Sequence, residues 1–207
     1  MRILHVIPLL LLLSACASSP SISEYQCMAG DWHTVGYRDA KQGLDATRLL
    51  DHQEACGEFG VVPDRDQYAA GWREGVESYC TADNGFYLGR QGKPVNRICS
   101  GPYHEPYASA HADGWHLYSV EHEVRRLEST LARSKSRLTT NRKEMVGATT
   151  AQLTPDLTAQ ERVGLVAKLE SLADERAKLQ TEIEKLEAEL VDARAALDRL
   201  NQTLALR

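Results

Sequence analysis

Hydrophobic residues near the C-terminus of this chain recur with a period of seven, in two successive runs. In the first run one core position of the heptad begins at Leu117 and returns every seventh residue. This position is occupied by Leu117, Val124, Leu131, Leu138 and Met145. The companion position is apolar at first and polar later, with Val120, Leu127, Ser134 and Asn141. The pattern predicts a coiled-coil helix that is interrupted between Gly147 and Thr154.

The second heptad run restarts at Thr154-Pro155 and continues to the C-terminus. Thr158 and Glu161 have the spacing of a capping box, which marks the start of a helix. Two rows of apolar residues follow: Leu169, Ile183, Leu190, Leu197 and Leu204 in one, and Leu165, Leu172, Leu179, Leu186 and Leu200 in the other. Arg176 occupies one core position of this pattern.

The two runs carry opposite charge. Residues 119–147 contain seven Lys/Arg and four Asp/Glu, a balance of +3, and residues 156–207 contain eight and eleven, a balance of −3. The charges and the short connection favour an antiparallel hairpin of the two helices. A parallel homodimer or trimer through the second helix is the alternative. The first run has about thirty residues and the second about fifty, so the two helices are expected to be roughly 45 Å and roughly 75 Å long. Unless they pack on the Cys-rich domain or on another subunit, the last turns of the second helix are therefore expected to lack an intrachain partner. Their unmatched leucines are the best candidate for an interaction surface.

Three shorter helices are expected before residue 80. Asp31 is suited to cap the first. The second spans Leu44–Phe59 and ends at Gly60, and the third starts at Pro63-Asp64. The third helix presents a stripe that we interpret as core, formed by Tyr68, Trp72, Val76 and Tyr79. The segment 36–40 also resembles the segment 71–75, which indicates either a duplicated helix or chance.

A short β-hairpin is expected next. Asp83-Asn84-Gly85 is a tight-turn sequence, and residues 86–88 and 95–98 have the composition of two short strands. The loop 89–94 would join these strands.

The cysteines indicate an oxidising compartment. Apart from Cys16 there are four, an even number, and three pairings of them are possible. We favour the two that close local loops, Cys27–Cys56 and Cys80–Cys99. Metal ligation is the alternative, but the chain has no Cys-x-x-Cys pair.

The N-terminus carries an export signal. Arg2 precedes an apolar run of about eleven residues, Ile3–Leu13, which is too short to span a bilayer. The four residues Leu13-Ser14-Ala15-Cys16 resemble the lipobox of bacterial lipoproteins. That resemblance implies cleavage before Cys16, lipidation of its thiol and, since no Asp follows it, sorting to the outer membrane. An ordinary signal peptide with release of a soluble protein is the alternative.

Composition separates two regions. All Trp, Tyr and Phe residues lie between Tyr25 and Tyr118. The formal charge of −5, with no basic patch among these aromatics, argues against nucleic acid as a partner.

Between Cys27 and Tyr118 many glycines, aromatics and cysteines match one family pattern in order. They are Asp31-Trp32, Gly36, Asp39, Gly43, Cys56, Pro63-Asp64, Tyr68, Gly71, Arg73, Gly75, Tyr79-Cys80, Asn84-Gly85, Gly89-Arg90, Gly92 and Cys99. This part resembles an uncharacterised family of Gram-negative envelope lipoproteins of the DUF-2799 type. It departs from that family at Ala40 and Val95, where Gly and Tyr would be expected. The resemblance implies a location and a fold and no reaction.

Two sets of polar residues are candidates for chemistry. Carboxylates near Asp31, Asp39 and Glu74 could serve an envelope enzyme as general acids or bases, but we favour their interpretation as helix caps and partners in ion pairs on helix faces. His104, His111 and His116 could bind a metal or small ligand, but their spacing matches no metal motif. No catalytic constellation emerges, so we expect a protein that is not an enzyme and has no cofactor beyond the lipid on Cys16.

The sequence thus predicts a mainly α protein in four parts. Residues 1–15 are a lipoprotein signal peptide and 16–26 a lipidated tether. Residues 27–118 form a small disulfide-stapled, helix-rich domain with a short β-hairpin, and 119–207 form a long helical coiled-coil hairpin. We expect an outer-membrane-anchored protein that faces the periplasm and has a structural role or binds a protein partner or itself.

Overall fold

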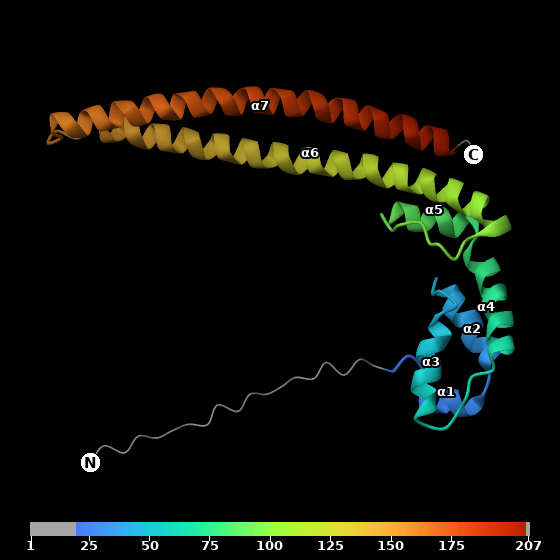
Figure 1. Cartoon of the computed structure of the whole chain (residues 1–207). Coiled ribbons are helices and arrows are strands. Elements are labelled where there is room, and N and C mark those ends of the chain that lie inside the picture. Colours follow the sequence, from blue (N-terminus) through green and yellow to red (C-terminus); the bar gives the residue numbers. More distant parts are fainter. Residues whose placement is uncertain (1–19, 206–207) are drawn as a thin grey trace, which may run out of the picture. The chain divides into compact units, whose positions relative to one another are not determined.

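The chain is mainly helical in the range that the structure describes, residues 20–205 of a computed structural model (Figure 1). In chain order the helices are α1 (Glu24–Ala29), α2 (Trp32–Lys41), α3 (Arg48–Gly57), α4 (Arg65–Tyr79), α5 (Ala82–Arg90), the 3₁₀ turn η1 (Gly101–Tyr103), α6 (His104–Ala151) and α7 (Ala159–Ala205). The expected signal peptide and Cys16 lie outside this range.

Contacts divide the helices into two compact units at the junction of Tyr79 and Cys80. The first unit contains α1 to α4 and the second α5 to α7. The change in composition at Tyr118 falls within α6, which runs unbroken from His104 to Ala151.

The first unit is built on a close crossing of α2 and α4. A side chain on Gly36 of α2 would collide with the carbonyl oxygen of Tyr68, and one on Gly71 of α4 would collide with that of His33. The contacts are reciprocal: Tyr68 lies three positions before Gly71, and His33 lies three positions before Gly36. Only residues without a Cβ allow two helix backbones to approach in this way.

The second unit repeats this crossing with α5 and α6. A Cβ on Gly89 would meet the carbonyl oxygen of His111, and one on Gly114 would meet that of Phe86, again three residues before the opposing glycine. Gly36 and Gly89 each follow a cysteine by nine residues, while Gly71 and Gly114 each follow one by fifteen. The chain therefore contains two copies of one disulfide-linked helix pair.

Disulfides join the elements of each copy. The structure pairs Cys27 with Cys56 and Cys80 with Cys99, which is the pairing favoured from the sequence. Each bond closes a local loop and, in the chain-entropy account, stabilises the fold by about 3 kcal/mol. The first disulfide is itself part of a small apolar core, which also contains Ile22, Trp32, Val35 and Tyr68.

The helices of the first unit follow the sequence pattern. Asp31 caps α2 by accepting a hydrogen bond from the backbone N–H of Thr34 at 3.1 Å. The expected core stripe on α4 is buried at Tyr68 and Val76, and Trp72 donates from its ring to the carbonyl of Leu44 at 3.0 Å. The second helix begins at Arg48, later than expected, because Asp45 closes a turn ahead of it.

The expected β-hairpin is wrong, since residues 20–205 contain no strand. Residues 82–90 form α5, which Thr81 caps by accepting from the N–H of Asn84. Gly85, Leu88 and Gly89 are buried at helical spacing, because α6 packs against that face. The second expected strand is an irregular segment, in which the backbone N–H of Ile98 bonds the side chain of Asn96 instead of a neighbouring strand.

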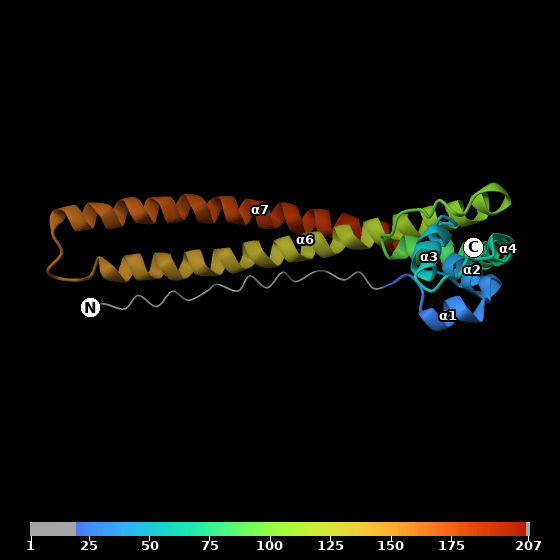
Figure 2. The same cartoon turned by 60° about the horizontal axis from the view of Figure 1, so that its bottom comes forward.

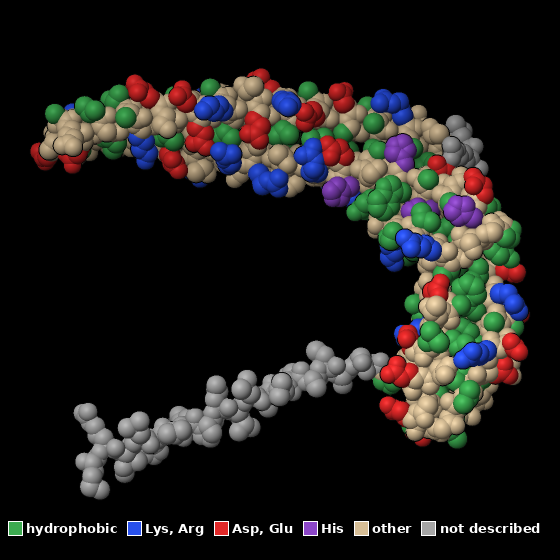
Figure 3. Space-filling model, in the orientation of Figure 1, with side chains coloured by type: hydrophobic (Ala, Val, Ile, Leu, Met, Phe, Trp, Pro, Cys, Tyr) green, Lys and Arg blue, Asp and Glu red, His purple; other side chains and the backbone are tan. Residues whose placement is uncertain are grey.

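Helices α6 and α7 lie side by side as a helical hairpin (Figures 1 and 2). The parallel dimer or trimer is therefore not needed to bury the heptad residues. Ion pairs link oppositely charged residues of the two helices: Lys135–Glu187 at 2.6 Å, Arg137–Glu175 at 2.9 Å and Arg194–Glu128 at 2.7 Å. Basic and acidic side chains are interspersed along the face of the hairpin that Figure 3 shows.

Two expectations about the hairpin are wrong. The first helix does not break at Gly147, because Ala148 continues the buried row and the helix ends only after Ala151. The helices are also matched in length, at 48 and 47 residues, because α6 starts at His104 rather than near Leu117. The late turns of α7 accordingly have a partner, and Leu197 packs against a core cluster to which α6 contributes Val124 and Leu127.

The polar heptad positions of α6 lie inside the hairpin. Ser134 and Asn141 are each 3% exposed. Ser134 donates to Glu182 at 3.0 Å, and the amide nitrogen of Asn141 donates to the carbonyl of Leu172 at 3.0 Å. A buried asparagine at such a position fixes the register of paired helices.

None of the helices within residues 20–205 combines the length and apolar character needed to cross a membrane.

The close helix crossing predicts opposite effects for one substitution at two glycines of α6. G114A places a methyl group against the backbone of α5 and should destabilise the protein by about 1–3 kcal/mol. G147A meets nothing within 4 Å and should be neutral or stabilise by up to about 1 kcal/mol. Urea unfolding of the oxidised protein followed by circular dichroism measures both. Equal effects would contradict the close approach.

Candidate functional site

A buried polar network in the first unit is the most site-like arrangement in the described chain. At its centre is Asp39 of α2, which is 7% exposed. One of its carboxylate oxygens, Oδ2, accepts a hydrogen bond from the hydroxyl of Tyr68 on α4 at 2.8 Å. The same oxygen lies 2.8 Å from Nε2 of His52 on α3. Asp39 therefore links three helices.

His52 extends the network to the N-terminal segment. Its ring is 2% exposed, and its second nitrogen, Nδ1, lies 2.8 Å from the hydroxyl oxygen of Ser21. Ser21 precedes α1, and the next residue, Ile22, is 6% exposed and belongs to the core. The order of groups is Ser21, His52, Asp39 and Tyr68.

The directions of the hydrogen bonds follow from the partners. A carboxylate oxygen accepts hydrogen bonds, so Nε2 of His52 carries a hydrogen and donates a hydrogen bond to Asp39. Nδ1 faces the hydroxyl of Ser21, which can either donate or accept. Burial, followed by the hydrogen bond to Asp39, raises the pKa of Tyr68 far above its ordinary value of 10.0, so its hydroxyl remains a donor. Every hydrogen bond of the network thus has a proton to supply it.

A cavity of about 110 Å³ lies beside this network. Its wall includes Ser21, Asp39 and His52 and four other polar side chains, Gln26, Arg38, Gln42 and Arg48. Sites for drug-sized ligands have volumes of about 300–1,000 Å³, so this cavity is suited only to a few waters or a very small polar molecule.

The network has the residue types of a serine hydrolase but a different geometry. In the hydrolase arrangement the serine faces Nε2 of the histidine and the aspartate faces Nδ1. Here Ser21 faces Nδ1 and Asp39 faces Nε2. The carboxylate oxygen of Asp39 that faces His52 also accepts a hydrogen bond from Tyr68. The network accordingly fits a structural task, which is to hold the segment around Ser21 against the first unit.

The three carboxylates proposed as acid–base candidates have separate partners. Asp31 caps α2, and hydrogen bonds from the side chain and backbone of Thr34 lower its pKa. Asp39 belongs to the buried network. Glu74 faces His33 at 3.3 Å on the surface. Eight residues, or about 12 Å of helix axis, separate Asp31 from Asp39, so the structure does not gather them into one site.

The three histidines proposed as ligands also have separate environments. Nδ1 of His104 lies 3.2 Å from the carbonyl oxygen of Cys99, and Nε2 of His111, which is buried, lies 2.7 Å from that of Lys93. His116 is exposed. Within the described residues, no three His, Cys, Asp or Glu side chains could together hold a metal ion.

Analysis of the sequence missed the network as a unit. Asp39 was a candidate and Tyr68 was assigned to the core, but neither spacing nor composition connected them with His52 or Ser21. The available signal was weak: a histidine on the apolar side of a short helix, next to a cysteine-bearing core.

The network predicts that Asp39 is a buried structural group. D39A leaves the donors of His52 and Tyr68 without a partner, at about 1–3 kcal/mol each, and should lower the unfolding midpoint strongly. The control D51A removes an exposed aspartate of the same unit and should change stability by less than about 0.5 kcal/mol. A D39A protein as stable as D51A would contradict this account.

A second prediction concerns Ser21. S21A removes the hydrogen bond to His52, worth about 1 kcal/mol, and should increase amide hydrogen exchange of residues 22–29 about fivefold. Exchange in α6 is the internal control and should not change. Unaltered exchange near α1 would show that the segment is held by other contacts.

Comparison with known proteins covers the region of both helix pairs. Residues 31–116 match the family model described as "Protein of unknown function (DUF2799)". No curated protein and no solved structure matches the chain. The matched region begins at the cap of α2 and ends two residues after Gly114, so it includes both reciprocal pairs of glycines described above. The match supports a DUF2799-type family, one of unknown function, for this part of the chain.

Proposed function

We propose that this protein is an outer-membrane-anchored lipoprotein that faces the periplasm and has a structural or protein-interaction role. The lipobox Leu13-Ser14-Ala15-Cys16 after an apolar run supports the anchor. The two disulfides support folding in an oxidising compartment outside the cytoplasm.

The position of Ser21 limits how far the first unit can lie from the anchor. Ser21 and Ile22 are fixed to the unit, by the hydrogen bond to His52 and by burial in the core. Only residues 17–20 lie between them and Cys16. Five residue steps reach at most about 18 Å. A lipid on Cys16 would therefore hold the first unit close to the bilayer surface.

The observation that carries the interaction role is the apolar surface at the closed end of the α6–α7 hairpin, which we call the hairpin tip, residues 145–166. Four large apolar side chains there are exposed: Val146 (66%), Leu153 (79%), Val163 (69%) and Val166 (49%). Apolar residues gathered in one place on a surface mark sites of contact with other molecules. Elsewhere on the hairpin, surface charges pair across the helices, and the exposed Val191 of α7 lies outside the tip.

The anchor is tested by mass spectrometry and fractionation of the protein from a Gram-negative host. The wild-type chain should begin at Cys16, carry acyl groups and sediment with the outer membrane. C16S should be released into the soluble periplasmic fraction, because each buried CH₂ of the anchor contributes about 0.8 kcal/mol to membrane binding. An unmodified Cys16 thiol would overturn the proposal.

The interaction role is tested by photo-cross-linking in cells. A photoreactive residue at Val163 of the hairpin tip should give a discrete protein adduct, and one at Lys185, an exposed position in the middle of α7, should give none. Adding L153E should abolish the Val163 adduct without releasing the protein from the membrane. The same adducts from both positions, or none from Val163, would contradict a contact through the tip.

A further inference from the structure

One position in the hairpin core is occupied by a charge. Along α7 the apolar row that contains Leu169, Ile183 and Leu190 has Arg176 at the position where the heptad requires a leucine. Leu172 and Leu179, on either side of it, are buried, whereas Arg176 is only half-buried. The packing of the two helices is therefore open at this level.

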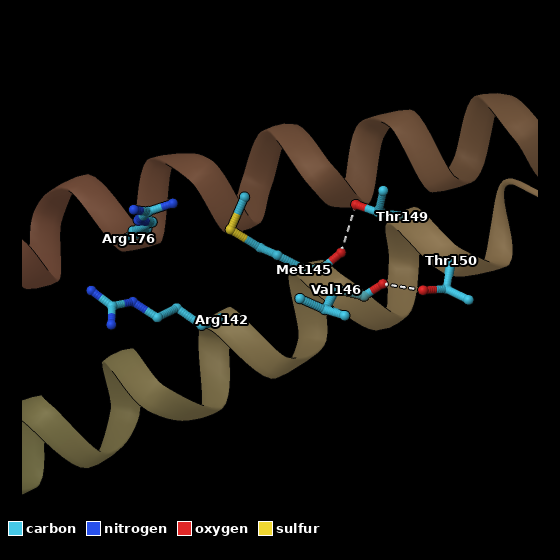
Figure 4. A pocket seen from close by; sticks show the side chains of 6 residues that line it. All are labelled: Arg142, Met145, Val146, Thr149, Thr150 and Arg176. Atoms are coloured by element: carbon cyan, nitrogen blue, oxygen red, sulfur yellow. Dashed lines mark hydrogen bonds between the residues drawn. The ribbon is translucent and has the colours of Figure 1, made fainter.

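A groove of about 410 Å³ lies at this opening (Figure 4). Six residues line it: Arg142, Met145, Val146, Thr149, Thr150 and Arg176. The threonine hydroxyls donate to backbone carbonyls one turn earlier, at 2.8 and 2.9 Å. The lining is mainly apolar, with both arginines at one end (Figure 4).

Three cations of the hairpin pair with glutamates of the facing helix, but the two arginines of this groove do not. Lys135, Arg137 and Arg194 each pair with a glutamate of the facing helix. Arg142 and Arg176 form no ion pair within the described chain, and no carboxylate lines the groove. The nearby Glu175 is already engaged by Arg137 at 2.9 Å and by Asn141 at 3.4 Å. Two like charges thus share one end of an apolar groove.

We propose that this groove binds an amphipathic anion, a phosphate group joined to an alkyl or acyl chain. The guanidinium groups of Arg142 and Arg176 would hold the phosphate, since arginine matches phosphate oxygens with paired hydrogen bonds. A phosphate carries up to two charges and can neutralise both arginines, whereas one carboxylate neutralises one. The chain of the ligand would lie along Met145, Val146 and the threonine methyl groups. The groove volume lies within the range of small-ligand sites, about 300–1,000 Å³.

The proposal is tested by calorimetric titration of the full mature chain in a non-ionic detergent and a buffer without phosphate. The probes are monohexyl phosphate, inorganic phosphate and hexanol, which separate the contributions of charge and alkyl chain. Monohexyl phosphate should bind at least about tenfold more tightly than inorganic phosphate, and hexanol should not bind measurably. Equal affinity for the two phosphates would overturn the amphipathic assignment, and no binding of either would overturn the site.

Variants assign the binding to the two arginines. R142Q and R176Q should each weaken binding of monohexyl phosphate about tenfold or more, in line with the loss of a charged hydrogen bond. K143Q, which removes a neighbouring cation that does not line the groove, should bind like the wild type. Unchanged affinity in R142Q and R176Q would overturn the assignment.

R176L separates loss of binding from loss of folding. Leucine completes the heptad row and removes one of two like charges, so this variant should melt at a higher temperature than the wild type and no longer bind monohexyl phosphate. A folded R176L protein that still binds the probe would contradict the proposal. Lipidation of Cys16 is measured separately on the same samples, so failure of the anchor and failure of the groove are distinguishable.

Discussion

Direct backbone contact between helices is the constraint on which both units depend. In each unit two helices cross so closely that a glycine on one faces a carbonyl oxygen of the other, reciprocally at Gly36 and Gly71 and at Gly89 and Gly114. A domain of this size has little apolar core to bury, and it compensates by bringing backbones together and by covalent links. In each copy a disulfide joins the segments that precede the two crossing helices. Its cysteines lie at the same distances in sequence from the crossing glycines in both copies.

The two copies have diverged in their polar interiors. In the first, the residue three positions before the second glycine is Tyr68, which donates to Asp39 and through it connects to His52 and Ser21. In the second, the corresponding residue is His111, which contacts the backbone carbonyl of Lys93. The elaborate network thus occurs in the copy that also receives the N-terminal segment. This correlation is consistent with a network that fixes the start of the folded chain.

The sequence was informative where a signal is local. The cap at Asp31, the core residue Tyr68, the pairing of the four cysteines and the antiparallel hairpin all follow from short-range chemistry or regular periodicity. The β-hairpin was wrong because Asn84-Gly85 and the apolar residues after it have strand and turn preferences, while the decisive fact, the approach of α6 to Gly85 and Gly89, is a tertiary contact. The length of α6 was underestimated because its first turns, near His104, pack on α5 and show no heptad pattern. The buried network depends on three elements meeting, which no single stretch of sequence encodes.

The continuity of α6 has a mechanical consequence. The same helix forms half of the hairpin and also presents Gly114 to α5. The end of α6 at the hairpin tip and the part that packs against α5 therefore belong to one stiff helix. A pull on the tip end would be transmitted along this helix to the segment that leads into it. There the bond between Cys80 and Cys99 ties that segment to the start of α5. Load applied to the second unit would therefore reach a covalent link before the α5–α6 crossing could separate completely.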